Sequence, residues 1–481
     1  MDPKSKQKNQ PTPTLSSGTA DQPLRVAVVG SGPAGFFVAQ HLLSKPDLVV
    51  TVDLYERLLT PFGLVRFGVA PDHEEIKRVA RQFDKVAAKP GFRFFGNVDV
   101  GSHVTLDELR GYYHIICFTT GAQTDRRMGI PGEDLARSHT ATEFVAWYNG
   151  HPEYQDCKFD LSVERVAVVG VGNVAVDVAR ILSRTAEELS TTDIADDALG
   201  VLSQSRIKEV YILGRRGPAQ AAFTNPEVKE LGELAGADIR VQKDEIALDP
   251  LSQAEVEQSD DRKLKRKLEI LGEFAARSPA EKRRTLTIRF LVSPVELVGN
   301  EAGQVVGLRV VRNQLVADRR GGLRAEATDQ SELLPVGLVF RSVGYHGVPL
   351  VGLPFDQKRG VVPNDRGRVL APSSDAPIPG VYVSGWIKRG PSGVIGTNKK
   401  DALETVEAMM EDLASGKLPS PHHSQPATVE SFVRQRQPEV VTYADWERIN
   451  QLEMERGEPQ GRPRVKFTST KEILAVLNRE G

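Results

Sequence analysis

Cysteine is scarce in this chain. Its 481 residues include only Cys117 and Cys157, which lie far apart and form no C-x-x-C pair. Because such a pair is the redox-active dithiol of disulfide reductases, this class of flavoenzyme is excluded. Cys117 lies in the apolar run His114–Phe118, where we expect a small buried strand residue. Two cysteines without a disulfide pattern are typical of a reducing compartment, so we expect a cytoplasmic protein.

Long hydrophobic runs and a strong net charge are also missing. No segment approaches the ~20 consecutive apolar residues of a membrane span. The formal net charge is −2, which argues against general nucleic-acid binding. Residues 1–22 have neither the apolar core of a secretory signal nor the arginines of a mitochondrial presequence. We expect them to form a disordered tail.

Two glycine-rich turns are present, and the first reads V-A-V-V-G-S-G-P-A-G. A predicted strand, Leu24–Val29, precedes it, and the predicted helix Pro33–Ser44 follows. A second strand then ends on the acid Glu56. Strand, glycine turn, helix and strand in this order predict a site where backbone N–H groups hold a pyrophosphate. An acid after the second strand accepts hydrogen bonds from a ribose with a free 2′-hydroxyl.

The second turn reads V-A-V-V-G-V-G-N-V-A, and arginines follow it in place of an acid. Its predicted helix is Asn173–Arg184, and its second strand Val210–Leu213 leads to Arg215 and Arg216. Two guanidinium groups suit a 2′-phosphate, which favours NADP(H) over NAD(H). An acidic insertion, Thr185–Gly200, makes the gap longer than the usual ~20 residues, which weakens this motif taken alone.

Three further features stay open from the residues alone. Glu227 and Glu230 lie one helical turn apart, either as acids on a helix face or with Glu227 at the nicotinamide or its ribose. The loop Pro61–His73 is rich in glycine, proline and phenylalanine, typical of core packing or of a wall for a flat ring. The loop Trp386–Asn398 opens a helix, and its N–H groups suit a phosphate or an electron-rich ring edge.

Four segments closely resemble the adrenodoxin reductase family of ferredoxin–NADP⁺ reductases, and its bacterial members most: Pro61–His73, Gly170–Leu182, Gly214–Thr224 and Gly385–Asn398. The likeness runs from about Leu24 to the end of the chain. It implies an α/β fold with two Rossmann-like dinucleotide-binding domains in the glutathione-reductase-like FAD/NAD(P) arrangement. The FAD-binding domain is then discontinuous, residues 23–127 and 366–481, and the NADP-binding domain is 128–365.

The resemblance also implies the site residues. His73 and one of Glu227 or Glu230 would lie near the nicotinamide side of the flavin. The FAD contacts would be Gly30, Gly32, Ala34, Gly35, Glu56, Leu64, Val100, Trp386, Gly393, Val394 and Ile395. The NADP(H) contacts would be Gly170, Val171, Gly172, Asn173, Val174, Arg215, Arg216, Glu227 and Gly393. The sequence holds no cluster with metal-ligand spacing, and no metal is expected.

The implied activity is hydride transfer between NADPH and FAD, followed by single-electron transfer to a ferredoxin. No ferredoxin-like cysteine cluster is fused to either end, so the iron–sulfur partner is expected to be separate. Ferredoxins are acidic, and the basic run Arg262–Lys267 is a candidate docking site or simply a solvated helix face. Two alternatives remain. An electron-input subunit of the glutamate-synthase small-subunit type requires N-terminal cysteines, which are absent, and a non-enzymatic redox sensor would keep its dinucleotides structurally.

Overall fold

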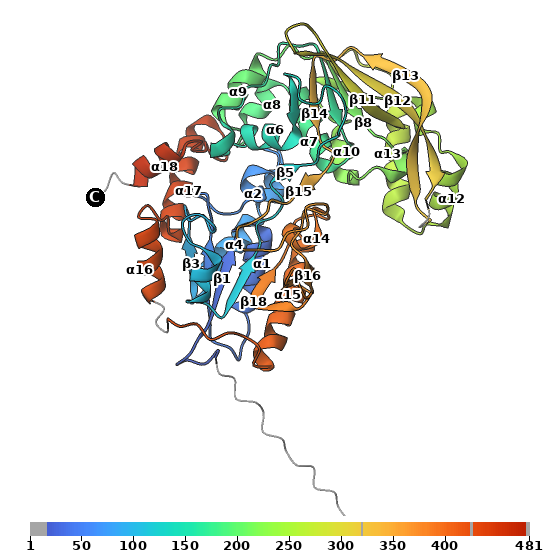
Figure 1. Cartoon of the computed structure of the whole chain (residues 1–481). Helices are drawn as coiled ribbons and strands as arrows, with labels where there is room; N and C mark the ends of the chain where they lie inside the picture. Colours follow the sequence, from blue (N-terminus) through green and yellow to red (C-terminus); the bar gives the residue numbers. More distant parts are fainter. Residues whose placement is uncertain (1–16, 319–320, 424–426, 478–481) are drawn as a thin grey trace, which may run out of the picture. The chain divides into compact units, whose positions relative to one another are not determined.

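Two separate parallel sheets organise the chain in the computed structural model, which describes residues 17–318, 321–423 and 427–477. The predicted disordered tail lies mostly outside these residues. The chain divides into two units (Figure 1). The first comprises the residues up to Val65, Arg78–Ala122 and His346–Glu447. The second comprises Arg66–Lys77, Gln123–Tyr345 and the residues from Arg448 onward.

The first unit is built on a seven-stranded sheet in the order β16-β17-β18-β4-β1-β2-β3. Its strands β1 and β4 are buried along their whole length, as expected for parallel strands with a layer on each face. Strands β2 and β4 flank β1, so the chain changes direction across the sheet at β1, where ligands bind in open α/β sheets. The strands are β1 (Leu24–Val29), β2 (Val50–Tyr55), β3 (Phe92–Phe95), β4 (Ile115–Phe118), β16 (Asn364–Asp365), β17 (Arg368–Leu370) and β18 (Pro377–Val383).

The second unit repeats this plan with a six-stranded sheet in the order β6-β14-β7-β8-β10-β9. Here β14 and β8 flank β7, so β7 takes the place that β1 has in the first unit. A three-stranded antiparallel sheet, β11-β12-β13, packs on one face through a shared apolar cluster that includes Val169, Leu213 and Leu308. The strands are β6 (Ser138–Thr140), β7 (Arg165–Val169), β8 (Glu209–Leu213), β9 (Ala237–Val241), β10 (Arg284–Arg289), β11 (Val292–Gly299), β12 (Val305–Ala317), β13 (Leu323–Leu334) and β14 (Leu338–Arg341).

The acidic insertion that lengthened the second motif folds into two helices. These are α8 (Ala186–Ser190) and α9 (Asp196–Ser203), between α7 (Asn173–Ser183) and β8. A capping box formed by Thr185 and Glu188 starts α8. Because β8 still pairs in parallel with β7, the insertion leaves the strand–turn–helix–strand unit intact.

The remaining elements connect these layers. In the first unit they are α1 (Pro33–Leu42), α4 (Ala80–Ala87), α5 (Leu106–Arg110), α14 (Trp386–Arg389), α15 (Thr397–Ala414) and α16 (Ala427–Arg436). In the second they are α3 (Glu74–Lys77), β5 (Thr124–Asp125), α6 (Ala141–Tyr148), α10 (Asn225–Glu230), α11 (Lys243–Ile246), α12 (Pro250–Gln258), α13 (Arg262–Ala276) and α18 (Thr470–Leu477). Three elements contain a boundary of the division: α2 (Leu64–Phe67), β15 (Tyr345–His346) and α17 (Tyr443–Gly457).

The two units differ from the predicted domain boundaries in four places. Residues 66–77 and 448–481 group with the second unit, the main segment of the second unit begins at 123, not 128, and the last segment of the first unit begins at 346, not 366. The first two differences have a physical reason, because Arg66 and Glu453 form a buried ion pair inside the second unit. Nucleotide motifs mark where a ligand is held, and they carry no information on such distant pairs. In the described part of the chain, no helix has the length and apolarity needed to cross a membrane.

Candidate active site and dinucleotide cradles

The first glycine turn leaves an open space at the start of α1. Gly30 has a φ of +106°, and a Cβ there would lie 2.8 Å from the Thr119 carbonyl oxygen. At Gly35 a Cβ would lie 2.1 Å from the Gly30 carbonyl oxygen, so this glycine permits close helix–strand packing. A Cβ at Gly32, by contrast, would meet nothing within 4 Å. Gly32 caps α1 without a side-chain acceptor for the first N–H groups, which fits a pyrophosphate.

Glu56 is built into this cradle. It follows β2, and its carboxylate accepts hydrogen bonds from the Ser31 N–H (3.0 Å), the Ser31 hydroxyl (2.7 Å) and the Leu58 N–H (3.1 Å). Glu56 therefore fixes the residue between the first two glycines of the turn. Each carboxylate oxygen accepts more than one hydrogen bond, so the group keeps acceptor capacity for a ribose hydroxyl.

Two segments of the first unit meet this cradle: the start of the Pro61–His73 loop and the start of the Trp386 loop. The Phe62 N–H donates to the Ser31 carbonyl oxygen at 3.0 Å, which places the start of the Pro61–His73 loop beside the glycine turn. Gly385 has a φ of +80°, and a Cβ there would lie 2.7 Å from the Ala34 Cβ. The loop that begins at Trp386 thus starts against α1. Leu64 (38% exposed) and Val394 (58% exposed) have accessible side chains there.

The other predicted FAD contacts lie as follows. Val100 is buried in an apolar cluster with Val29 and Tyr55. The Trp386 ring nitrogen donates to the Ser392 carbonyl oxygen at 3.1 Å, while Gly393 is exposed and Ile395 half-buried in the same loop. Sequence reasoning missed Asp401, whose carboxylate accepts the Ser384 hydroxyl (2.9 Å) and the Gly385 N–H (2.5 Å) and so fixes where this loop begins. A lone acid in a long helix gives no such signal.

The second glycine turn repeats the geometry of the first. Gly170 has a φ of +135°, and a Cβ there would lie 2.2 Å from the Ser342 carbonyl oxygen. A Cβ at Gly172 would again meet nothing within 4 Å, and Ala175 is fully buried where the first turn has its third glycine. The Asn173 side-chain oxygen accepts the Thr224 N–H at 2.8 Å. This bond ties the cradle to the start of α10.

Val171 and Val174 complete the predicted contacts of this turn. The Val171 carbonyl oxygen accepts the N–H groups of Ala222 and Phe223, each at 2.9 Å, which adds to the tie between the cradle and α10. Both valine side chains are half-buried at the edge of the main apolar cluster.

Arg215 and Arg216 follow β8 as two cations that have no counter-charge among the residues the structure describes. Their backbone is fixed, because the Arg215 carbonyl accepts from the Asn313 side chain (2.8 Å) and the Arg216 carbonyl accepts the Leu291 N–H (3.1 Å). Within the described residues, neither guanidinium forms a hydrogen bond or an ion pair. A fixed backbone with two unoccupied guanidinium groups fits a phosphate monoester.

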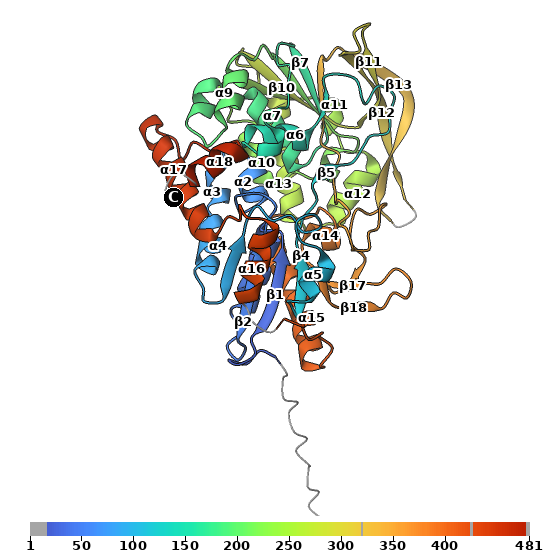
Figure 2. The same cartoon turned by 60° about the vertical axis from the view of Figure 1, so that its left-hand side comes forward.

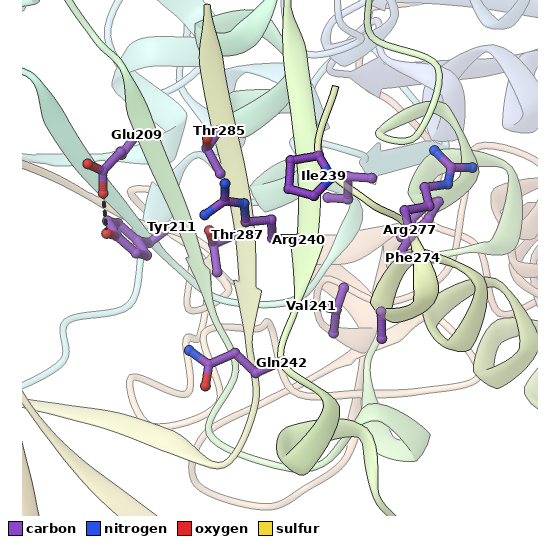
Figure 3. Close-up of a pocket in the computed structure, with 12 residues that line it drawn as sticks. Glu209, Tyr211, Ile239, Arg240, Val241, Gln242, Phe274, Arg277, Thr285 and Thr287 are labelled. Carbon is purple, nitrogen blue, oxygen red and sulfur yellow. Dashed lines mark hydrogen bonds between the residues drawn. The ribbon is translucent and has the colours of Figure 1, made fainter. Parts of the chain in front are cut away.

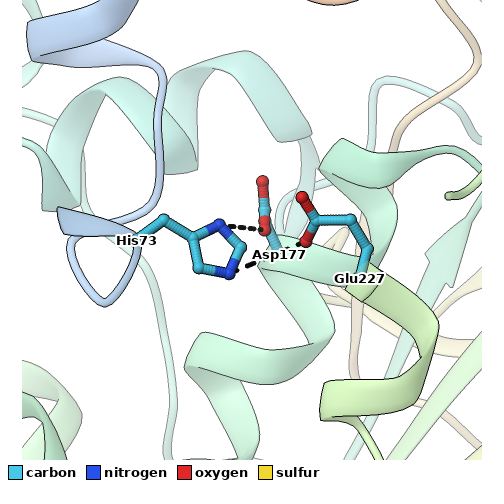
Figure 4. Close-up of side chains that lie close together, drawn as sticks. All are labelled: His73, Asp177 and Glu227. Atoms are coloured by element: carbon cyan, nitrogen blue, oxygen red, sulfur yellow. Dashed lines mark ion pairs between the residues drawn. The ribbon is translucent and has the colours of Figure 1, made fainter. Parts of the chain in front are cut away.

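His73 contacts acids from two helices of the second unit (Figure 4). Its Nε2 lies 2.8 Å from a Glu230 carboxylate oxygen and 3.7 Å from one of Glu227, both on α10. Its Nδ1 lies 3.9 Å from an Asp177 carboxylate oxygen on α7. The structure therefore brings His73 together with both candidate acids, Glu227 and Glu230, and it adds Asp177.

A buried arginine holds these acids in place. Arg180 is fully buried, and its guanidinium donates to both carboxylate oxygens of Asp72, at 2.7 and 3.0 Å. It also donates to Asp177 at 2.7 Å and to Glu227 at 3.4 Å. Sequence reasoning missed this cluster. The available signal was a pair of opposite charges, Asp177 and Arg180, on the otherwise apolar helix α7.

The acids and the histidine have shifted pKa values. Burial raises the pKa of Glu227 to about 7, and the nearby Asp177 carboxylate adds to the shift. Burial also acts on Glu230, but its hydrogen bond to His73 and the Arg180 charge outweigh burial, so the pKa of Glu230 is lowered. Burial works against the charged form of His73, yet the Glu230 hydrogen bond and the Asp177 and Glu227 charges raise its pKa. These shifts favour a charged His73–Glu230 pair, and it lies beside the Glu227 carboxyl, whose pKa is about 7.

A metal ion does not fit this cluster. Ligand atoms of His73, Asp177 and Glu227 lie within 4.8 Å of one another. However, Arg180 already neutralises two of the three groups, and a divalent cation among them would meet its positive charge. The group is better suited to holding protons.

A separate pocket of about 530 Å³ lies beside the edge strand β9 (Figure 3). Glu209 and Thr285, at the amino ends of β8 and β10, line it. None of the predicted site residues does. Because neither the second glycine turn nor the Arg215–Arg216 pair lines it, this pocket is separate from the predicted NADP(H) site.

Comparison with known proteins agrees with this geometry. Residues 24–229 match the family described as pyridine nucleotide-disulphide oxidoreductase. Over 466 residues the chain is 46% identical to the NADPH-ferredoxin reductase FprA of Mycobacterium tuberculosis, covering 95% of this chain and 99% of the relative. It is 40% identical to a mitochondrial NADPH:adrenodoxin oxidoreductase of Arabidopsis thaliana, covering 96% of both.

The chain belongs to the adrenodoxin reductase-like family of ferredoxin–NADP⁺ reductases. The solved structure of Mycobacterium tuberculosis FprA in complex with NADPH is similar, with a TM-score of 0.89 and 46% identity over 95% of this chain and 99% of that one. The predicted fold class, two Rossmann-like domains in the glutathione-reductase-like arrangement, is therefore confirmed. The family resemblance is confirmed as well.

Proposed function

We propose that this protein is an FAD-dependent NADPH:ferredoxin oxidoreductase. The observation that carries this function is the pair of cradles, one followed by the acid Glu56 and the other by the cations Arg215 and Arg216. Relatives that match nearly the whole chain are named for the same activity. When bound, FAD and NADPH supply the redox chemistry: hydride passes from nicotinamide to flavin, and electrons leave singly to an iron–sulfur protein.

The chain's own residues bind, orient and manage protons. The first cradle, Glu56 and the Trp386 loop hold FAD, and the second cradle with its two arginines holds NADP(H). His73 and Glu230 form the charged pair expected near the nicotinamide, while Glu227, with a pKa of about 7, takes up or releases a proton as the charge of the site changes. Arg180 holds these side chains in position through its ion pairs with Asp72 and Glu227.

Electrons have no route through the chain's own cysteines. Cys117 is buried and burial raises the pKa of its thiol, and Cys157 lies far away in sequence. An electron-input subunit of the glutamate-synthase type uses cysteine-bound clusters, and this chain has too few cysteines to hold one. The electrons are therefore proposed to pass to a separate acceptor protein. The cytoplasmic location stays a prediction from the two free cysteines.

We narrow the proposed ferredoxin-docking site to three residues of the basic run Arg262–Lys267. Of the basic run, Arg266 pairs with Glu269 and Glu273, and Lys267 is half-buried and donates to the Ala221 carbonyl oxygen. The side chains of Arg262, Lys263 and Lys265 are exposed or nearly so, and among the described residues they have no acidic partner. These three cations on α13 are the ones we propose to meet an acidic ferredoxin.

The purified protein tests this function directly. NADPH-driven reduction of cytochrome c is measured with and without each ferredoxin of the host. We expect a yellow, FAD-containing protein whose cytochrome c reduction depends strongly on at least one ferredoxin. A colourless protein would favour the redox-sensor alternative. A yellow protein that reduces no ferredoxin would contradict the proposed acceptor.

A further inference from the structure

The loop that carries His73 is anchored at its first end by a buried ion pair. Arg66 donates two hydrogen bonds to the Glu453 carboxylate, at 2.9 and 2.5 Å, and the two side chains are 4% and 0% exposed. Glu453 also accepts the Phe467 N–H at 2.9 Å. The Arg66 end of the loop is therefore bound to the C-terminal segment Glu453–Phe467, which we call the strap (red in Figure 2).

The second end of the loop is anchored to the same strap through an aspartate. Lys77, the last residue of α3, lies 2.6 Å from one Asp193 oxygen. Lys466 of the strap lies 3.1 Å from the other, and its side chain is 1% exposed. Arg462 fixes the strap beside this aspartate by donating to the Thr192 carbonyl oxygen at 2.9 Å.

His73 lies between these anchors with little freedom of its own. Its N–H donates to the Ala70 carbonyl oxygen at 3.0 Å, and its carbonyl accepts the N–H groups of Ile76 (3.1 Å) and Lys77 (3.3 Å). The preceding residue, Asp72, is held by Arg180 and Arg184, each with an atom at 2.7 Å. A backbone hydrogen bond thus joins His73 directly to Lys77 at the second anchor.

We propose that Glu453 and Lys466 are positioning residues whose task is to hold His73 against Glu230 and Glu227. This inference rests on the proposed role of His73. The strap reaches the loop through buried charges, and removing one partner of a buried ion pair leaves the other uncompensated. The loop must then move to rehydrate that charge, and the 2.8 Å contact between His73 and Glu230 is lost.

The test measures two quantities separately: the pKa of His73 and the rate of flavin reduction by NADPH. The charged groups that face His73 are Asp72 of its own loop, Asp177 and Arg180 of α7, and Glu227 and Glu230 of α10. Against burial and the Arg180 charge, which lower the pKa of His73, the acids Glu230, Asp177 and Glu227 raise it above the ordinary value of about 6.5. A histidine released from these acids titrates closer to that value. NMR of the FAD-loaded full chain with labelled histidine reports this titration, and the signal that disappears in His73→Gln assigns the resonance.

Glu453→Gln is the principal variant, and Glu245→Gln is its matched control. Glu245 is also fully buried, and it accepts hydrogen bonds from Arg289 (2.7 Å), the Phe290 N–H (2.8 Å) and Arg312 (2.9 Å) at a place unrelated to the loop. We expect Glu453→Gln to lower the pKa of His73 and to slow stopped-flow reduction of the flavin by NADPH about tenfold. Glu453→Asp should restore much of both, and Glu245→Gln should change neither.

Each outcome decides one question. A wild-type His73 titration in Glu453→Gln overturns the positioning role, and so does an equal shift in the Glu245→Gln control. A lowered pKa with a wild-type rate upholds the strap and contradicts the proposed role of His73 in hydride transfer. If Glu453→Gln does not fold, Lys466→Met takes its place, because it removes the strap's ion pair to Asp193. A wild-type His73 titration in Lys466→Met likewise overturns the positioning role.

Discussion

The two cradles have the same backbone geometry, but different charges follow them: an acid follows the first and two arginines follow the second. In the first, Glu56 is 9% exposed and already bonded to the turn that it serves. In the second, Arg215 is exposed, and neither it nor Arg216 has a partner among the described residues. We propose that one supersecondary unit serves two dinucleotides here, and that the residues after its second strand set the choice between them.

This contrast also suggests how long each dinucleotide stays. An acid that orders its own turn makes the cradle part of the folded core, as suits a resident FAD. Two arginines that meet no acid within the described part of the chain suit a phosphate-bearing substrate that binds and leaves. The predictions below test the contrast, beginning with the largest expected effect.

Removing both arginines should abolish the preference for NADPH. Each guanidinium–phosphate hydrogen bond contributes about 1.5–3 kcal/mol, so Arg215→Ala with Arg216→Ala should weaken NADPH binding roughly a hundredfold or more. NADH binding should change little, because NADH has no 2′-phosphate. Equilibrium titration with both nucleotides measures this, and Arg240→Ala on β9, also exposed, is the control. Equal losses for NADPH and NADH would contradict the assignment.

Changing the acid should affect the other cofactor. Glu56→Ala removes the acceptor of the Ser31 and Leu58 N–H groups as well as the ribose contact. We expect at least a tenfold fall in FAD affinity, from the loss of about 1.5–3 kcal/mol per hydrogen bond to a charged group. Flavin absorbance per protein after dialysis gives the occupancy. NADPH affinity should remain as in the wild type, and a parallel loss of both nucleotides would break the comparison.

Exposed cations elsewhere in the second unit should not contribute to NADPH binding. Replacing Arg262, Lys263 and Lys265 with glutamine should raise the KM for ferredoxin about tenfold and weaken its salt dependence. NADPH affinity and ferricyanide reduction should stay unchanged, since neither involves an acidic protein partner. Unchanged ferredoxin kinetics would exclude α13 as the docking site.

The smallest effect is expected from Glu227. Its folded-state pKa is raised to about 7, above the ordinary 4.5, so the folded protein binds a proton that the unfolded chain has lost. Stability from this group is therefore present at low pH and is lost as the pH rises from about 4.5 to 7. Glu227→Gln should raise Tm by a few degrees at pH 8 and by less at pH 5. A larger gain at pH 5 would contradict the raised pKa.

Patterns of residues close in sequence predicted the two cradles. Contacts between residues far apart in sequence were found only in the structure. Gly30 and Gly170 adopt positive φ within short strand–turn–helix segments whose residues all lie close in sequence. The sequence therefore predicted both turns and the charges after them. Arg180, by contrast, gathers Asp72 and Glu227 from segments on either side of it. The periodicity of the sequence does not predict such a contact, although the charged pair Asp177 and Arg180 in an otherwise apolar helix was a sign of it.

The C-terminal region shows the same limit. The family resemblance assigned it to the FAD-binding domain, but Glu453 and Lys466 are buried against residues of the second unit. Buried ion pairs of this kind join single residues far apart in sequence, and composition does not distinguish them from solvated charges. The extra spacing before Arg215 was readable as an insertion, yet only the pairing of β8 with β7 showed that it was harmless.

Anaerobic mixing of the purified, FAD-containing protein with NADPH or NADH tests the central claim most directly. If the first cradle holds FAD and the second reads the 2′-phosphate, NADPH should bleach the flavin at concentrations far below those that NADH requires. This preference should disappear when Arg215 and Arg216 are alanine. Equal bleaching by the two nucleotides in the wild-type protein, or a preference that survives the loss of both arginines, would contradict the account.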